Sequence, residues 1–324
     1  MRLLKLAGIG DTVLLSALVG DLKAWNPDVH VTMVVAPSNA IYARLLPLVD
    51  EVLVVPVKNP LRALSILRRE SADLMINADS WARLSALLGA LSRARWVIGF
   101  QTPGQLRHYA DDQLIPHRAD KHEIDNDRSL LATLGIPVGG PPLKPPTQPA
   151  PPELRGAVIF HLWPGGTKSH LREWPLENWA SLLERLARSG VQKFVLTGAP
   201  EQRVLNDRFI AALPASFQAG VHNAAGMPMQ NTINLLAEAA LLISVDTGVM
   251  HIGAALGTKV ISLHGPSNPR RWGPIGERVQ PLTSSQPGAG RLVLGFEYDS
   301  DQNFMTGLSI DEVETCARKM LGTP

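Results

Sequence analysis

Short apolar runs and longer amphipathic segments alternate along the first part of the chain. The apolar runs have the length of buried strands, whereas the amphipathic segments repeat their apolar residues with a helical period. We predict strands at residues 3–6, 29–35, 52–55 and 74–77, and helices at residues 12–25 and 61–70. Strands that alternate with helices indicate crossover units and a parallel sheet.

The same alternation restarts after a proline-rich segment, IPVGGPPLKPPTQPAPP at residues 136–152, which suits neither a helix nor a central strand. Further strands are predicted at residues 157–162, 193–197, 241–245 and 259–264. A chain of 324 residues also exceeds what one hydrophobic core usually organises. We therefore predict an α/β protein with two Rossmann-like, doubly wound domains, 1–150 and 151–308. A C-terminal helix at 309–324 follows, and we consider that it packs back on the N-terminal domain.

Composition narrows the range of partners and locations. The formal charge of +2 and the scattered basic residues argue against nucleic acid as a partner. Cys316 is the only cysteine, which fits a reducing compartment and excludes an internal disulfide. The start, MRLLKLAGIGD, reaches Asp11 before a signal-like apolar core is complete, and the sequence has no run of about 18 apolar residues that could span a bilayer. We expect a cytoplasmic protein and leave peripheral membrane contact open.

Candidate chemistry follows several of the predicted strands, where open parallel sheets bind their ligands. Asp11 follows the first strand, and it is either the cap of a helix or a carboxylate able to accept a proton from a hydroxyl. After the strand at 157–162, the turn Gly165, Gly166 and Thr167 offers N–H groups for a phosphate, which Lys168 or Arg172 could neutralise. The alternative there is a flexible polar loop.

Three further strand ends have side chains that could contact a ligand. Glu201 is either a first-turn acid that meets the helix dipole or a ligand of ribose hydroxyls, and Met227 either packs on a base or belongs to the core. Asp246, Thr247, Gly248 and His251 stand where a strand turns into a helix. Capping and anion binding use the same N–H groups at such a point. The histidines lack metal-ligand spacing with carboxylates, so we predict no metal site.

The sequence resembles glycosyltransferase family 9, the ADP-heptose heptosyltransferases of lipopolysaccharide core assembly. The run SVDTGVMHIGAALGTKVISLHGPSNPRRWGP at residues 244–274 is similar to the donor-site signature of that family. The segments GIGDTVLLSAL, KHEIDNDRSLLATLGIP, REWP and TGAPEQ also fall in the family's order, so the resemblance spans nearly the whole chain. One departure is Arg172, which stands where the family usually has lysine.

The resemblance implies a GT-B fold with an interdomain cleft and inverting, metal-independent sugar transfer. It implies that the N-terminal domain binds a glycan or lipid-linked acceptor and that the C-terminal domain binds a nucleotide-sugar such as ADP-heptose. Asp11 would then be the general base. Gly165, Gly166, Thr167, Lys168, Arg172, Thr247 and Gly248 would hold the diphosphate; Glu201 and Met227 would contact the nucleoside; Asp246 and His251 would contact the sugar or its phosphate. No cofactor is expected beyond this substrate.

Two other functions fit the same architecture. A sugar-nucleotide epimerase can share the two-domain fold and would convert its substrate without an acceptor. A non-catalytic sugar-binding protein would need no base at Asp11 and in bacteria would usually carry an export signal.

Overall fold

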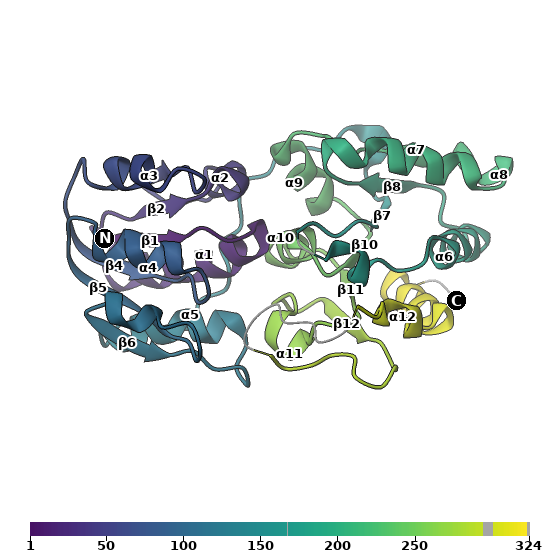
Figure 1. Ribbon diagram of the computed structural model, residues 1–324. Helices are drawn as coiled ribbons and strands as arrows, with labels where there is room; N and C mark the ends of the chain where they lie inside the picture. Colours follow the sequence, from purple (N-terminus) through teal and green to yellow (C-terminus); the bar gives the residue numbers. More distant parts are fainter. Residues whose placement is uncertain (167, 294–300, 323–324) are drawn as a thin grey trace. The chain divides into compact units, whose positions relative to one another are not determined.

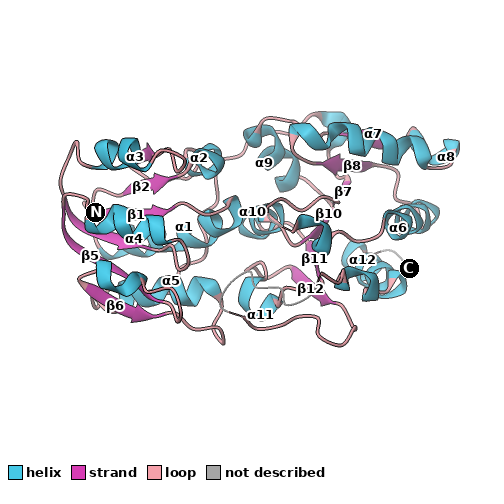
Figure 2. Cartoon of the chain, in the orientation of Figure 1, coloured by secondary structure: helices cyan, strands magenta, loops and turns pink. Residues whose placement is uncertain are grey.

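The computed structural model describes residues 1–166, 168–293 and 301–322, and the chain forms two compact units. The first unit contains residues 1–146, and the second contains residues 147–292 and the C-terminal segment from residue 301. The division lies inside the proline-rich segment at residues 136–152. Each unit is an α/β structure in which helices flank a sheet (Figure 2).

The first unit has a six-stranded parallel sheet in the order β3-β2-β1-β4-β5-β6 (Figure 1). Its strands are β1 (Arg2–Lys5), β2 (Thr32–Val35), β3 (Glu51–Val54), β4 (Ala72–Asn77), β5 (Ala94–Gln101) and β6 (Gln113–Pro116). Its helices are α1 (Ile9–Trp25), α2 (Pro37–Ala43), α3 (Pro60–Leu67), α4 (Arg83–Ala90) and α5 (Glu123–Ala132), with a short 3-10 helix, η1 (Arg107–Ala110).

The second unit repeats this plan with the strand order β12-β11-β10-β7-β8-β9. Its strands are β7 (Val158–His161), β8 (Phe194–Thr197), β9 (Val221–Asn223), β10 (Leu241–Val245), β11 (Val260–His264) and β12 (Val279–Thr283). Its helices are α6 (Leu176–Arg188), α7 (Arg203–Ala212), α8 (Ala215–Gln218), α9 (Met229–Ala237), α10 (Gly248–Leu256), α11 (Pro269–Trp272) and α12 (Ile310–Leu321). Its described residues also form the 3-10 helices η2 (Pro152–Leu154), η3 (Ser169–Arg172), η4 (Pro200–Gln202) and η5 (Phe304–Gly307).

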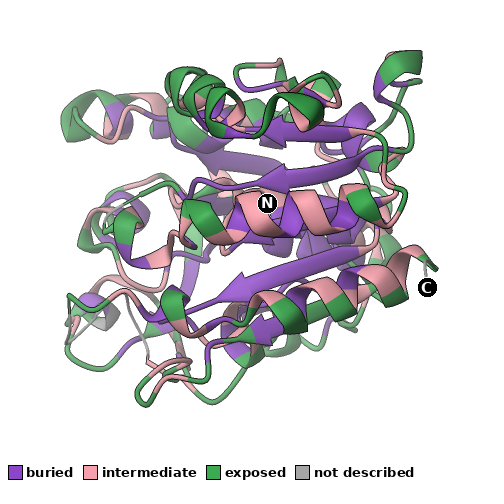
Figure 3. Cartoon of the chain, turned by 90° about the vertical axis from the view of Figure 1, so that its right-hand side faces the viewer, coloured by how far each residue is buried: buried purple, intermediate pink, exposed green. Residues whose placement is uncertain are grey.

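Each sheet is buried between its helices, which explains why its central strands read as continuous apolar runs. In the first unit, Leu4, Met75 and Val97 from neighbouring strands pack against Leu67 and Leu88 of α3 and α4. In the second unit Trp179, Leu182, Leu183 and Leu186 form the apolar face of α6, which is completely buried. Figure 3 shows the strands of this unit buried and the exposed residues on the outer sides of its helices.

The C-terminal helix α12 belongs to the second unit. Val313 and Ala317, one helical turn apart, are completely buried in the same apolar cluster as Leu182 and Leu186 of α6. The apolar face of the helix is thus covered by the core of its own unit, and packing of the helix on the N-terminal domain stays a prediction.

Candidate active site

The strand order reverses beside the first strand of each sheet. In the first unit β1 lies between β2 and β4, and in the second unit β7 lies between β10 and β8. Open α/β sheets bind ligands beyond the carboxyl ends of the strands at such a reversal. Asp11 follows β1, and the turns at Gly165 and Asp246 follow β7 and β10, so these predicted residues lie at the two reversal points.

Asp11 is the third residue of α1 and lies in the first turn of the helix. The N-cap of α1 is Gly8 and not Asp11, but the Gly8 N–H donates to Asp11 Oδ2 over 3.2 Å, so Asp11 helps to cap the helix from its third position. The Asp11 side chain is 21% exposed, and its Oδ1 lies 3.9 Å from the Lys5 ammonium. Burial raises the pKa of Asp11, the Lys5 ammonium opposes this rise, and the acids Glu123 and Asp79 add to it. A carboxylate with a raised pKa at a strand end is suited to accept a proton.

A charged cluster surrounds Asp11 that the sequence analysis did not identify. The Lys5 ammonium lies 3.6 Å from Asp127 Oδ1 of α5 and donates to the Ala78 carbonyl over 2.9 Å. Asp79, after β4, accepts the Leu6 N–H over 3.0 Å. One signal was available, because Asp127 falls at helical spacing in the buried stripe of α5 with Ile124 and Leu131, where an apolar residue is expected.

Arg172 connects two of the predicted loops in the second unit. Its guanidinium donates to the Asp246 carbonyl over 3.0 Å and also to the Gly165 carbonyl. Gly166 has φ +86°, a left-handed conformation that glycine adopts without strain. Thr167 lies outside the described residues. The structure therefore brings Gly165, Asp246 and Arg172 together, with Arg172 fixing the backbone of both turns.

Lys168 follows this turn and forms an exposed ion pair. Its ammonium lies 2.9 Å from Asp301 Oδ1, and both side chains are well exposed. Surface pairs of this kind contribute little to stability, so the ammonium can exchange partners readily.

The start of α10 has the predicted cap. Thr247 is the N-cap, and its hydroxyl oxygen accepts the Val249 N–H over 3.2 Å. Gly248 begins the helix, and His251 is buried within its first turns. The remaining N–H groups of the first turn and the helix dipole favour an anion at this point. Capping is confirmed, and a ligand role for Asp246, Thr247, Gly248 and His251 stays a prediction.

The loops after β8 and β9 also come together. The Gly226 N–H donates to the Gly198 carbonyl over 2.9 Å, and Arg203 donates to the Ala225 carbonyl over 3.0 Å. Glu201 on η4 is exposed, and Met227 is half-buried beside this junction. The two residues predicted to contact a nucleoside thus belong to joined loops.

Two general features of the described residues bear on ligands and membranes. No group of three or more His, Cys, Asp or Glu side chains among them is placed to hold a metal ion. Within the same part of the chain, no helix is long and apolar enough to cross a membrane.

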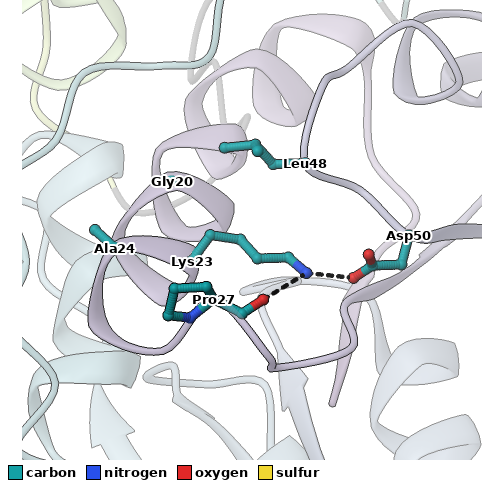
Figure 4. A pocket seen from close by; sticks show the side chains of 6 residues that line it. All are labelled: Gly20, Lys23, Ala24, Pro27, Leu48 and Asp50. Carbon is teal, nitrogen blue, oxygen red and sulfur yellow. Dashed lines mark hydrogen bonds and ion pairs between the residues drawn. The ribbon is translucent and has the colours of Figure 1, made fainter.

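A pocket in the first unit lies away from this chemistry (Figure 4). Gly20, Lys23, Ala24, Pro27, Leu48 and Asp50 line it, and the Lys23 ammonium reaches Asp50 Oδ2 over 2.7 Å. Lys23 is in the last turn of α1, about 18 Å along the helix axis from Asp11 at the usual rise per residue. The pocket therefore lies where β2 and β3 begin, at the opposite end of the strands from Asp11.

The doubled Rossmann-like architecture, in which each parallel sheet reverses beside its first strand, places the protein in the GT-B fold class. The chain belongs to glycosyltransferase family 9 (heptosyltransferase), whose sequence model matches residues 61–291. It is 28% identical over 134 residues to lipopolysaccharide heptosyltransferase 2 of Salmonella typhimurium. The aligned residues cover 41% of this chain and 36% of that protein. The match thus spans about a third of the length of this curated relative.

Two solved structures share the fold over nearly the whole chain. The ADP-heptose lipopolysaccharide heptosyltransferase II of E. coli has a TM-score of 0.77 with 18% identity, covering 99% of this chain and 98% of that one. The family 9 glycosyltransferase of Veillonella parvula has a TM-score of 0.79 with 19% identity, covering 99% and 96%. The predicted fold class is confirmed by these structures.

Proposed function

We propose that this protein is an inverting glycosyltransferase that moves a heptose or a related sugar from an ADP-sugar to a hydroxyl of a glycan acceptor. The acceptor we propose is the lipopolysaccharide inner core; the names of the curated relatives support lipopolysaccharide as the class of acceptor. The observation that carries the proposal is Asp11, a partly exposed carboxylate with a raised pKa at the strand reversal of the first unit.

In the proposed reaction Asp11 takes the proton from the acceptor hydroxyl. The hydroxyl oxygen then attacks the anomeric carbon of the donor sugar, and the bond from that carbon to the diphosphate oxygen breaks. One displacement inverts the anomeric centre, and the ADP leaves with the bonding electrons. A positioned base of this kind contributes roughly 10²- to 10⁴-fold to the rate.

The second unit supplies the groups that would receive the negative charge of the leaving ADP. The first-turn N–H groups of α10, the exposed Lys168 ammonium and the backbone of the turn held by Arg172 all lie at strand ends of one sheet. Positive groups aimed at a developing charge stabilise the transition state. We propose that these groups meet the diphosphate and that the reaction needs no metal ion. Glu201 and Met227 would hold the nucleoside, and Asp246 and His251 the sugar or its phosphate.

The test replaces Asp11 by Asn, which keeps the size of the side chain and removes the base. We expect Asp11→Asn to lower turnover at least about 10²-fold while ADP affinity stays near the wild-type value. Turnover is measured as ADP release from an ADP-sugar with lipid-linked and soluble acceptors, with EDTA present, and affinity is measured by calorimetry. A variant that keeps most of its rate would show that Asp11 is only a cap. Sugar conversion without any acceptor would instead indicate an epimerase.

A further inference from the structure

Lys5 is a buried cation at the end of β1. It is the last residue of the strand, and only 2% of its side chain is exposed. Its ammonium donates a hydrogen bond to the Ala78 carbonyl over 2.9 Å. Burying an ammonium is costly unless opposite charges compensate it. A lysine in this place therefore needs a reason beyond packing, because an apolar residue would fill a strand end at lower cost.

The compensating charges come from three different elements. Asp11 Oδ1 of α1 lies 3.9 Å from the ammonium, and Asp127 Oδ1 of α5 lies 3.6 Å from it. Glu123 of α5 and Asp79 after β4 act on the same ammonium over a longer range. Burial alone would lower the pKa of Lys5, but these four acids, Asp127 first, raise it instead. Lys5 therefore stays charged.

The more distant acids have partners of their own. Both carboxylate oxygens of Glu123 lie 3.2 Å from His117 Nε2. Asp79 accepts the Leu6 N–H and also interacts with the Arg107 guanidinium. In contrast, neither carboxylate oxygen of Asp127 has a hydrogen-bond partner among the described residues. The Lys5 ammonium thus lies within 3.9 Å of two carboxylates, the buried Asp127 and the partly exposed Asp11.

We propose that Lys5 is a positioning residue whose buried ammonium is the counter-charge of Asp11 and keeps that carboxylate ionised and ready to accept a proton. The inference rests on the proposed function, since it gives Asp11 the role of base. The Asp127 carboxylate is in turn a counter-charge of the Lys5 ammonium, and it holds that ammonium in the protein interior at the end of β1. Burial and the acids Glu123 and Asp79 raise the pKa of Asp11, and Lys5 is the principal group that lowers it.

The proposal gives a sign for the pH dependence. Removing Lys5 leaves burial and the neighbouring acids unopposed, so the pKa of Asp11 rises further. The base is then protonated over a wider acidic range, and the acid limb of the kcat/KM profile moves to higher pH. An opposite charge within this distance typically shifts a carboxyl pKa by about 1–3 units, so we expect Lys5→Met to move the limb by about one unit or more.

The experiment measures kcat/KM against pH for full-length wild type, Lys5→Met and the matched control Lys23→Met. Lys23 carries the same charge at the far end of α1 and pairs with Asp50 in the pocket of Figure 4, so its loss should leave the limb in place. Since Lys5→Met leaves buried acids without a counter-charge, Asp127→Asn and Lys5→Met/Asp127→Asn are measured as a second pair. The double variant has the same net charge in the cluster as the wild type. Its comparison with Asp127→Asn isolates the effect of losing Lys5.

An upward move of the limb from Asp127→Asn to the double variant, with ADP affinity unchanged, supports the proposal. The proposal is overturned if the acid limb lies at the same pH in the two members of each pair, even if the rate falls. A purely structural lysine would change the rate and would not change the pH at the midpoint of the limb. The proposed function fails separately. If Asp11→Asn keeps its rate, Asp11 is no base. If Asp11→Asn is inactive and the acid limb does not move when Lys5 is replaced, only the role proposed for Lys5 is wrong.

Discussion

Arg172 shows how the role of one residue changes once its partners are known. From the sequence it was a cation able to neutralise a phosphate, whereas in the structure two of its N–H groups hold the Gly165 and Asp246 carbonyls. The rigid fork of a guanidinium can hold two carbonyls at once, which an ammonium on a flexible stem does less well. Arg172 therefore shapes the turns that we propose hold the diphosphate.

We expect Arg172→Lys to weaken ADP binding although it keeps the charge. Losing one charge-assisted hydrogen bond costs about 1.5–3 kcal/mol, which corresponds to roughly tenfold or more in affinity if the loss is felt only in the bound state. Calorimetric titration with ADP measures this, and Arg188→Lys, an exposed residue paired with Glu184, is the control. Wild-type affinity in Arg172→Lys would mean that a positive charge alone is sufficient and that the two carbonyl bonds do not shape the site.

At the scale of elements, the assignment of α12 to the second unit can be tested by a cavity. Val313 is completely buried among residues of the second core, whereas its neighbour Glu312 is exposed. We expect Val313→Ala to lower the free energy of unfolding of the second unit by about 1–3 kcal/mol and Glu312→Ala to change it little. Hydrogen exchange during urea unfolding locates the effect. Loss of protection in β1–β6 instead would contradict the assignment.

Which elements could be predicted from sequence depends on how deeply they are buried. The central strand at 241–245 is buried at every position, and its predicted and observed bounds agree. The edge strands β6, β9 and β12 were not predicted, because they are short or half-exposed and β12 contains Pro281. The internal strand β5 was missed as well, and none of its first three residues is buried. The candidate site residues at the strand ends could be predicted from the local sequence pattern, because they directly follow apolar runs. The contacts between Lys5 and Asp127, or between Arg172 and Asp246, join distant parts of the chain, so no local pattern identifies the partner, although the position of Asp127 in α5 indicates that it is buried.

At the scale of the whole molecule, each unit has its own apolar core, so a ligand of one unit should stabilise that unit first. We propose that the nucleotide is held by the second unit, where the loops after β7, β8 and β10 come from adjacent strands. ADP at about 100 times its Kd should stabilise this unit by about 2.7 kcal/mol.

The measurement is hydrogen exchange of the full chain with and without ADP, with UDP and GDP as controls and EDTA throughout. We expect ADP to slow exchange in the backbone of residues 163–166, 198–202 and 246–251, and UDP and GDP to act only at much higher concentration. Equal protection by the three nucleotides would retain the binding site but remove the preference for an ADP-sugar, because diphosphate contacts alone cannot distinguish the bases. No protection at residues 246–251 would show that the start of α10 is a cap without a ligand, and the donor site would then have to be sought at other strand ends.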